Sequence, residues 1–323
     1  MMIACGNVIL CYKITGASRM PRPTVCDWRT RLQFHHPSTF STTEQEKVNE
    51  PLQAGGRFAK IIKIKAGEIM YSKNDYIAVF DSGIGGISVL RQLRKVMPRE
   101  RFLYYGDSAN APYGTRPTEE VRALTLAAAE KIITEYPVKA LVVACNTATA
   151  AAIEDLRTKY SDLIVVGIEP AVKLAADHHP GGNIGVMATE VTLREEKFDL
   201  LMHRFDADRV IYKIPSPGLV ELIEAGRGDS EETQVFLREL LKPYMGRLDA
   251  LVLGCTHYPF VKHNIQAILG PGTEVLHGGN GTARETKRRL AEAGLLHEGE
   301  GEVLIRSSSR NEEKIRLAEK LLG

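Results

Sequence analysis

Two cysteines of this chain lie in nearly identical surroundings, Cys145 in KALVVACNTAT and Cys255 in DALVLGCTHYP. Each follows an apolar run, each has a threonine within two residues, and the two are 110 positions apart (255 − 145). A thiolate is both a strong base and a strong nucleophile. Two matched thiols that face one substrate from opposite sides could take a proton from one face of a carbon atom and return one to the other. The predicted chemistry is therefore inversion of a stereocentre.

The residues after Cys145 predict the surroundings of its thiol. Asn146 and Thr147 lead into an alanine-rich helical pattern, which places the cysteine at a helix N-terminus. Free backbone amides and the helix dipole stabilise an anion there, so we expect the pKa of the thiol to fall from about 8.5 toward neutrality. A lone cysteine is more often a small buried packing residue. The duplicated context favours the catalytic interpretation.

Two carboxylates and a histidine are candidates for proton exchange with these thiols. Asp81 ends an apolar run and could serve Cys145, whereas His257 follows Cys255 by two residues. Glu224, near the end of a helical pattern, is either a solvated carboxylate or an acid lining the site. A zinc site made from the two thiols and the histidine would lack the closely spaced ligand pairs that such sites use. We therefore predict no metal.

Two polar loops could contact a ligand. In DSGIGG, Ser82 and the following glycines could bring backbone amides close to an anion, although the sequence lacks the third glycine of a dinucleotide-binding loop. The structural alternative is a tight turn capped by Asp81 or Ser82. In NAPYGTRP, Tyr113 and Gly114 could bind a carboxylate or an ammonium group, or the tyrosine could simply pack.

A duplication organises the elements that must position these residues. The β-branched runs at 76–80, 101–105 and 140–144 recur at 183–187, 209–213 and 250–254. Their offsets are 107, 108 and 110 residues (183 − 76, 209 − 101, 250 − 140). Further strands are expected within 163–173, 273–279 and 302–307, with helices from about Thr282 and Asn311. Three runs recurring in order predict two similar units related by a pseudo-dyad.

Alternation of short strands and helical patterns is typical of an α/β fold with parallel sheets. We expect two pseudo-symmetric parallel-sheet α/β domains, domain A comprising 70–165 plus 278–323 and domain B comprising 166–277. In open parallel sheets, ligands bind beyond the carboxyl ends of the strands, and the polar motifs fall there. The active site is therefore predicted in the cleft between the two domains.

The first 69 residues show no sustained period. We interpret residues 1–69 as a disordered extension or as upstream sequence from a wrongly chosen start codon. Met70 leaves the usual few residues before the first strand, so we expect translation to start there.

Composition excludes several classes of protein. The chain has 323 residues, 44% of them hydrophobic, which suggests two domains with sizeable cores. Residues 1–69 hold 10 of 42 basic and 5 of 40 acidic residues, which leaves 32 against 35 and a net charge of −3 for the rest. A nearly neutral charge after residue 69 predicts no nucleic-acid partner. The sequence also has no run of eighteen apolar residues that could span a membrane. Five cysteines without paired spacings fit free thiols in a reducing cytoplasm.

The motifs DSGIGG, GDSANAPYG, ACNTAT, GIEP and GCTHYP, in that order, closely resemble the glutamate racemases of the cofactor-independent aspartate/glutamate racemase family. The resemblance runs from about Tyr76 to the C-terminus. It implies an isomerase that interconverts L-glutamate and D-glutamate without pyridoxal phosphate or another cofactor. It also implies D-glutamate supply for peptidoglycan, a cytoplasmic location, a small-molecule substrate as partner, and a homodimer as a possible assembly.

The resemblance also implies roles for individual residues. Cys145 would remove the Cα proton of D-glutamate with the help of Asp81. Cys255 would remove that of L-glutamate with the help of His257 and Glu224. In each direction the opposite thiol returns a proton. The substrate would be held by Ser82, Tyr113, Gly114, Asn146, Thr147 and Thr256 together with Asp81 and His257, with Thr189 and Thr192 bordering the site.

Three other functions stay open from the residues alone. A racemase of the same fold could act on aspartate or another acidic amino acid, because pocket size is not readable from sequence. A thiol hydrolase or lyase would need one essential cysteine and a covalent intermediate. A catalytically silent binding protein would tolerate serine at both cysteines.

Overall fold

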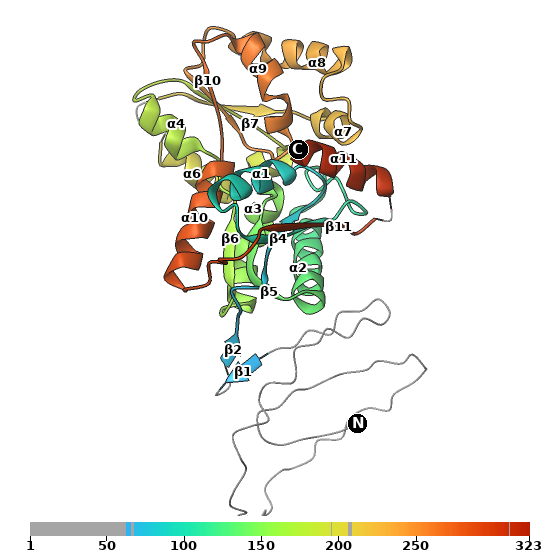
Figure 1. Ribbon diagram of the computed structural model, residues 1–323. Helices are drawn as coiled ribbons and strands as arrows, with labels where there is room; N and C mark the ends of the chain where they lie inside the picture. Colours follow the sequence, from blue (N-terminus) through green and yellow to red (C-terminus); the bar gives the residue numbers. More distant parts are fainter. Residues whose placement is uncertain (1–62, 66–67, 195, 206–208, 310) are drawn as a thin grey trace, which may run out of the picture. The chain divides into compact units, whose positions relative to one another are not determined.

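The computed structural model describes residues 63–65, 68–194, 196–205, 209–309 and 311–323. Strands β1 (Lys63–Lys65) and β2 (Glu68–Met70) pair antiparallel as a small sheet of their own. The remainder of the predicted N-terminal extension lies outside the described residues. The rest of the described chain forms two parallel sheets covered by helices, which Figure 1 shows.

The first sheet has five parallel strands in the order β11-β4-β3-β5-β6. Their bounds are β3 (Tyr76–Asp81), β4 (Arg101–Gly106), β5 (Val138–Val143), β6 (Ile164–Gly167) and β11 (Glu302–Ser307). Side chains alternate across the sheet, as the strand period of two requires. Ala78 and Phe80 belong to one apolar cluster, whereas Ile77 and Val79 belong to the other.

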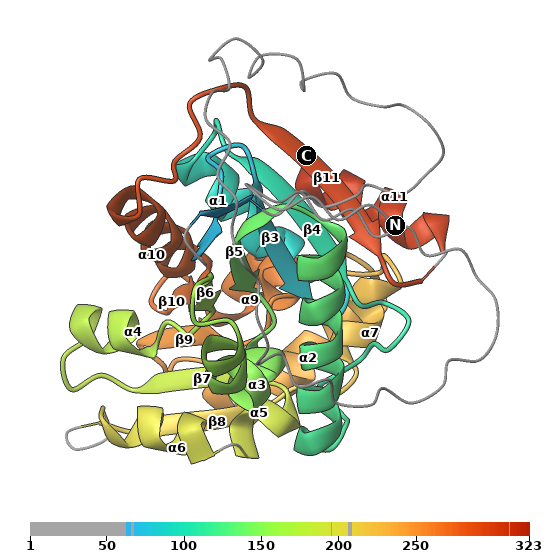
Figure 2. The ribbon, with the colours of Figure 1, turned by 90° about the horizontal axis from the view of Figure 1, so that it is seen from below.

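Helices cover both faces of this sheet (Figure 2). On the face of Phe80 lie α2 (Thr118–Glu135) and α3 (Asn146–Lys159). On the face of Val79 lie α1 (Ile87–Val96), α10 (Gly279–Glu292) and the C-terminal α11 (Glu312–Leu322). Three elements from the end of the chain, α10, β11 and α11, thus belong to the first sheet and its helices.

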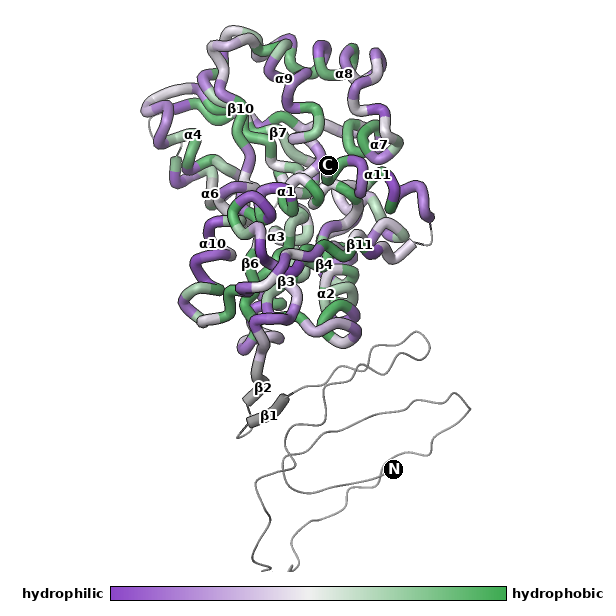
Figure 3. The backbone as a smooth tube through the Cα atoms, in the orientation of Figure 1, coloured by the Kyte–Doolittle hydropathy of each residue, from purple (hydrophilic) through white to green (hydrophobic). Residues whose placement is uncertain are grey.

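The second sheet has four parallel strands in the order β10-β9-β7-β8. Their bounds are β7 (Ile184–Ala188), β8 (Ile211–Pro215), β9 (Ala250–Leu253) and β10 (Glu274–His277). One face packs against α7 (Leu219–Glu224), α8 (Glu231–Leu241), η1 (Lys242–Tyr244), η2 (Tyr258–Val261) and α9 (Lys262–Leu269). The other packs against α4 (Val172–His178), α5 (Glu190–Arg194) and α6 (Glu196–His203). Figure 3 shows hydrophobic residues along strands such as β7 and hydrophilic turns on outer helices such as α10.

The duplication extends to a fourth pair of strands that the sequence offsets left unmatched. The order β4-β3-β5-β6 in the first sheet repeats as β8-β7-β9-β10 in the second. Strands β6 and β10 start 110 residues apart (274 − 164), the offset found for the two cysteines. The predicted α/β fold class with two parallel sheets is confirmed. The division into domains at 165/166 and 277/278 stays a prediction. Strand β6 of the first sheet crosses the first of these boundaries, since it ends at Gly167.

No helix among the described residues combines the length and the apolar character needed to cross a bilayer.

Candidate active site

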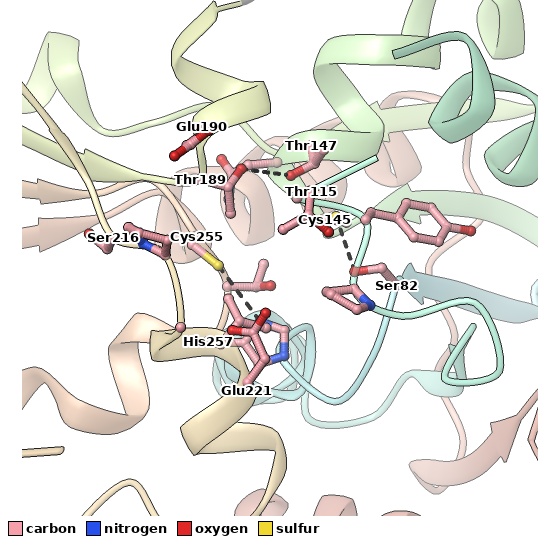
Figure 4. Close-up of a pocket in the computed structure, with 18 residues that line it drawn as sticks. Ser82, Thr115, Cys145, Thr147, Thr189, Glu190, Ser216, Glu221, Cys255 and His257 are labelled. Carbon is pink, nitrogen blue, oxygen red and sulfur yellow. Dashed lines mark hydrogen bonds between the residues drawn. The ribbon is translucent and has the colours of Figure 1, made fainter. Parts of the chain in front are cut away.

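The two cysteines line one cavity of about 180 Å³. Each lies two residues beyond a matched strand, since β5 ends at Val143 and β9 ends at Leu253. Figure 4 shows Cys145 with Ser82 on one side of this pocket and Cys255 with His257 on the other. The carboxyl ends of both sheets therefore contribute a thiol to the same space.

Most of the residues predicted from sequence come together here. The cavity is lined by Ser82, Tyr113, Gly114, Cys145, Asn146, Thr147, Thr189, Cys255, Thr256 and His257. Asp81, Thr192 and Glu224 form hydrogen bonds to lining residues. The predicted set is thus one connected site built from both halves of the chain.

Cys145 is the N-cap residue of α3. Its Sγ accepts a hydrogen bond from the Ala148 amide at 3.5 Å and lies 3.5 Å from the Ser82 hydroxyl. Burial, with the nearby Asp81 carboxylate as a second cause, raises the pKa of this thiol to about 12, although the Ala148 and Ser82 contacts act to lower it. The expectation of a pKa near neutrality is therefore wrong, because desolvation of the buried thiol outweighs the helix N-terminus.

Asp81 is fully buried at the end of β3. Its Oδ1 accepts from the Gly83 amide at 2.9 Å, and its Oδ2 accepts from the Thr256 hydroxyl at 2.9 Å. Burial raises the pKa of this carboxyl, while the charge of His257 acts in the opposite direction. Burial therefore shifts both Asp81 and Cys145 toward their protonated forms, and the carboxylate acts on the thiol through its charge.

The second thiol has a different set of partners. His257 Nδ1 lies 3.7 Å from Cys255 Sγ, and His257 Nε2 lies 2.8 Å from Glu224 Oε1. Burial acts to lower the pKa of His257, but Cys255 and Glu224 outweigh it and raise that pKa well above its usual value. The geometry therefore favours an imidazolium between a sulfur atom and a carboxylate.

Glu224 is the last residue of α7 and is held by several donors. Its Oε1 accepts from the Ile84 amide at 2.8 Å as well as from His257, and its Oε2 accepts from Lys314 Nζ at 2.9 Å. Burial acts to raise the pKa of this carboxyl, yet these hydrogen bonds and charges lower it to about 2. Glu224 is therefore an ionised anchor for the histidine.

The glycine-rich turn after β3 makes room for these side chains. A Cβ atom on Gly83 would lie 2.0 Å from Glu224 Oε1, and one on Gly85 would lie 2.4 Å from His257 Nδ1. Here the glycines allow close approach of side chains from the second half of the chain. The dinucleotide alternative is not needed to explain them.

Three threonine hydroxyls meet at another border of the site. Thr147 Oγ1 lies 3.2 Å from Thr189 Oγ1 and 3.3 Å from Thr192 Oγ1, and the last two are 3.0 Å apart. Gly114 packs against this cluster, since a Cβ there would lie 2.7 Å from Thr189 Cγ2. Thr147 comes from α3 and the other two from the β7–α5 segment, so the cluster joins the two halves.

Two polar atoms in or near the wall bear on ligand binding. Three buried polar side-chain atoms of the described residues have no hydrogen-bond partner. Of these three, only Asn146 Oδ1 belongs to a residue that lines the cavity. The Tyr113 hydroxyl donates to Asp107 Oδ2 at 2.6 Å. The proton of that hydroxyl is thus engaged within the protein, and the role of Tyr113 in ligand binding stays a prediction. Asn146 Oδ1 is an acceptor without a partner in the wall.

Sequence reasoning missed part of the wall. The additional lining residues are Pro112, Thr115, Glu190, Ser216, Pro217, Gly218, Val220 and Glu221. The duplication could have predicted the residues from Ser216 onward. Strands β4 and β8 are counterparts, and the turn that starts at Ser216 follows β8 just as the Tyr113 loop follows β4. No lysine or arginine is among the described residues that line the cavity.

Within the described ranges, no group of three or more histidine, cysteine, aspartate or glutamate side chains is arranged to hold a metal ion.

The chain is similar to proteins of one family. The profile of the Asp/Glu/Hydantoin racemase family matches residues 87–286. A glutamate racemase of Clostridium perfringens is 48% identical over 253 residues, which cover 77% of this chain and 97% of that protein. The crystal structure of a glutamate racemase isoform from Bacillus anthracis superposes with a TM-score of 0.71 at 31% identity, covering 78% of this chain and 95% of that one.

The chain is also similar to a racemase solved with a bound ligand. The structure of glutamate racemase from Francisella tularensis with D-glutamate has a TM-score of 0.69 at 27% identity, covering 77% of this chain and 94% of that one. The chain has two thiols on one cavity between duplicated α/β sheets, and it belongs to the Asp/Glu/Hydantoin racemase family. It is an isomerase, and within this family the relatives described above are glutamate racemases.

Proposed function

We propose that this protein interconverts L-glutamate and D-glutamate by direct proton transfer at Cα, without a cofactor. The observation that carries the proposal is the pair of thiols on one cavity, each with its own acid–base partner. Relatives named glutamate racemase, at up to 48% identity, support glutamate as the substrate. The bound D-glutamate of the Francisella tularensis structure supports it further.

The chemistry divides between the two sides of the cavity. A Cα–H bond beside a carboxylate is a very weak acid, so the reaction needs a base on one face and an acid on the other. Cys145 is the base for D-glutamate, with buried Asp81 as the group that exchanges a proton with it. Cys255 is the base for L-glutamate, with His257 as its proton partner and Glu224 as the anchor of His257. In each direction the opposite thiol delivers a proton to the carbanion.

Substrate binding explains how a thiol with a raised pKa becomes reactive. An ammonium group between the thiols favours thiolate formation, because an adjacent positive charge stabilises the anion. Asn146 Oδ1, buried and without a partner, is an acceptor for that ammonium. The hydroxyls of Ser82 and Thr147, with the Gly114 amide, are donors for the carboxylates and for charge that develops at Cα.

The biological setting follows from the substrate. D-glutamate is a building block of peptidoglycan, so the enzyme supplies cell-wall synthesis. We assign it to the cytoplasm, where reduced thiols persist, and both site cysteines are free. A homodimer stays a prediction, and sedimentation equilibrium of the purified protein tests it.

Solvent exchange tests the proposed reaction. The protein is incubated separately with L-glutamate and D-glutamate in deuterated water, without pyridoxal phosphate or added metal. Both enantiomers should gain deuterium at Cα and should interconvert, which NMR and circular dichroism measure. L-aspartate and D-aspartate are run in parallel, and faster turnover of aspartate would replace glutamate as the substrate. Absence of exchange with both amino acids would overturn the proposal.

The two-thiol scheme makes a prediction about each cysteine. Cys145→Ala and Cys255→Ala should each abolish racemisation, because one face of the carbanion then loses its proton donor and acceptor. Polarimetry of both directions, with unfolding curves to show that the variants fold, measures the effect. A hydrolase or lyase mechanism would require only one of the thiols, so near-normal turnover in either variant contradicts the scheme.

A further inference from the structure

Lys314 is connected to the Cys255 side of the site although it does not line the cavity. Its Nζ donates to Glu224 Oε2 at 2.9 Å, across 90 residues of sequence. Lys314 belongs to α11, which packs on the first sheet, whereas Glu224 ends α7 on the second. It also lies beyond residues 87–286, the part that the family profile matches.

The surroundings distinguish this ion pair from those on the surface. The side chains of Glu224 and Lys314 are 10% and 27% exposed, whereas the pair Lys173–Asp177 on α4 is 73% and 55% exposed. Exposed pairs contribute little to stability, because water and salt screen them. Reduced access to solvent makes the Lys314–Glu224 contact a stronger constraint on the carboxylate.

The bonds of Glu224 show what this constraint does. Oε1 serves His257 and the Ile84 amide, both at 2.8 Å, and only Oε2 faces Lys314. Fixing Oε2 fixes the rotation of the carboxylate, and this rotation sets the direction from which Oε1 meets Nε2 of the imidazole. Without the ammonium group, Oε2 would lose a charged donor, and the carboxylate could turn away from His257.

We propose that Lys314 is a positioning residue that, through Glu224, orients His257 toward Cys255 and so makes α11 part of the L-glutamate half of the site. This inference rests on the proposed racemase function. Lys314 touches no reacting atom, and its action passes through two side chains.

Kinetics can separate this role from a general loss of structure. L- and D-glutamate have equal free energies in water, so any variant must change kcat/KM equally in the two directions. The altered step is revealed instead by the primary isotope effects of Cα-deuterated substrates. If proton transfer at Cys255 slows, the isotope effect should grow for L-glutamate, which Cys255 deprotonates, and shrink for D-glutamate.

The experiment compares three variants of the full chain. Lys314→Met removes the charge, Lys314→Arg keeps it, and Lys320→Met makes the same change at an exposed lysine of the same helix. Lys314→Met should lower kcat/KM about 10- to 100-fold in both directions, the range expected for a misplaced catalytic group. It should also increase the primary isotope effect for L-glutamate and decrease that for D-glutamate. Lys314→Arg should restore most of the activity, and Lys320→Met should match the unsubstituted protein.

A second measurement does not depend on turnover. The ring resonances of His257, assigned with His257→Asn, should move in Lys314→Met and stay unchanged in Lys320→Met. Unchanged resonances, or a loss of activity that leaves both isotope effects as they were, would overturn the positioning role. If the unsubstituted protein fails to racemise, the proposed function fails, and the resonances still decide whether Lys314 positions His257.

Discussion

The two thiols occupy matched positions but have unlike neighbours. Cys145 is surrounded by a hydroxyl, an amide and a buried carboxylate, whereas Cys255 adjoins an imidazole anchored by Glu224. Sequence placed Cys145 at a helix N-terminus correctly. It could not predict the degree of burial, which depends on side chains from both halves of the chain and sets the pKa of the thiol.

Glu224 gives a pH-dependent prediction. Its pKa in the folded protein is about 2 against an ordinary value of 4.5, so its ionised form stabilises the fold above about pH 4.5, and this contribution is lost as the pH falls toward 2. Glu224→Gln should therefore reduce the free energy of unfolding by about 3 kcal/mol near neutral pH, and the difference should shrink below pH 4.5. Urea unfolding from pH 7 to 3 measures it, and a constant difference would contradict the assignment.

At the scale of elements, the glycine-rich turn between β3 and α1 is the contact surface for the second half of the chain. From the sequence, the glycines of this turn predict backbone amides that lie close to an anion. The structure adds a steric reason for the glycines, the close contact with Glu224 and His257, which are more than 130 positions away in sequence. Only the tertiary structure brings those side chains against the turn.

This turn predicts the effect of one added methyl group. Gly83→Ala would place Cβ 2.0 Å from Glu224 Oε1, so the flexible carboxylate must move away from His257. We expect a loss of kcat of about 10- to 100-fold with destabilisation of about 1–3 kcal/mol. Gly281→Ala, in helix α10 with open space around its Cβ, is the matched control and should add up to about 1 kcal/mol of stability. Equal activities of the two variants would exclude the steric argument.

For the whole molecule, the duplication was the most informative part of the sequence. It predicted the strands and the two parallel sheets, and it predicted that the matched cysteines share a cleft. It did not reveal β6 and β10 as a fourth pair, because the apolar runs around Ile164 and Glu274 are short and differ in composition. The wall at Ser216 was not predicted, since it carries no distinctive motif, and Glu190 was not predicted although Thr189 and Thr192 beside it were.

Ligand binding should stabilise the two halves together, because the cavity wall comes from both. At 100 times the dissociation constant, either enantiomer of glutamate should add about 2.7 kcal/mol to the free energy of unfolding. Glutarate, which lacks the ammonium group, should stabilise less at equal concentration because Asn146 Oδ1 stays without a donor. Thermal unfolding with each ligand measures this, and equal stabilisation by glutarate would remove Asn146 from the binding scheme.

The wall of the cavity has a consequence for turnover. Glu190 and Glu221 line it, and lysine and arginine are absent from its described lining. A wall of guanidinium groups would hold both enantiomers tightly and would lower KM without raising kcat, because such attraction is the same for substrate and transition state. Apart from His257, the described wall offers neutral donors, which attract a doubly carboxylated molecule less strongly than guanidinium groups would. The described wall therefore lacks the uniform attraction that would stabilise substrate and transition state alike.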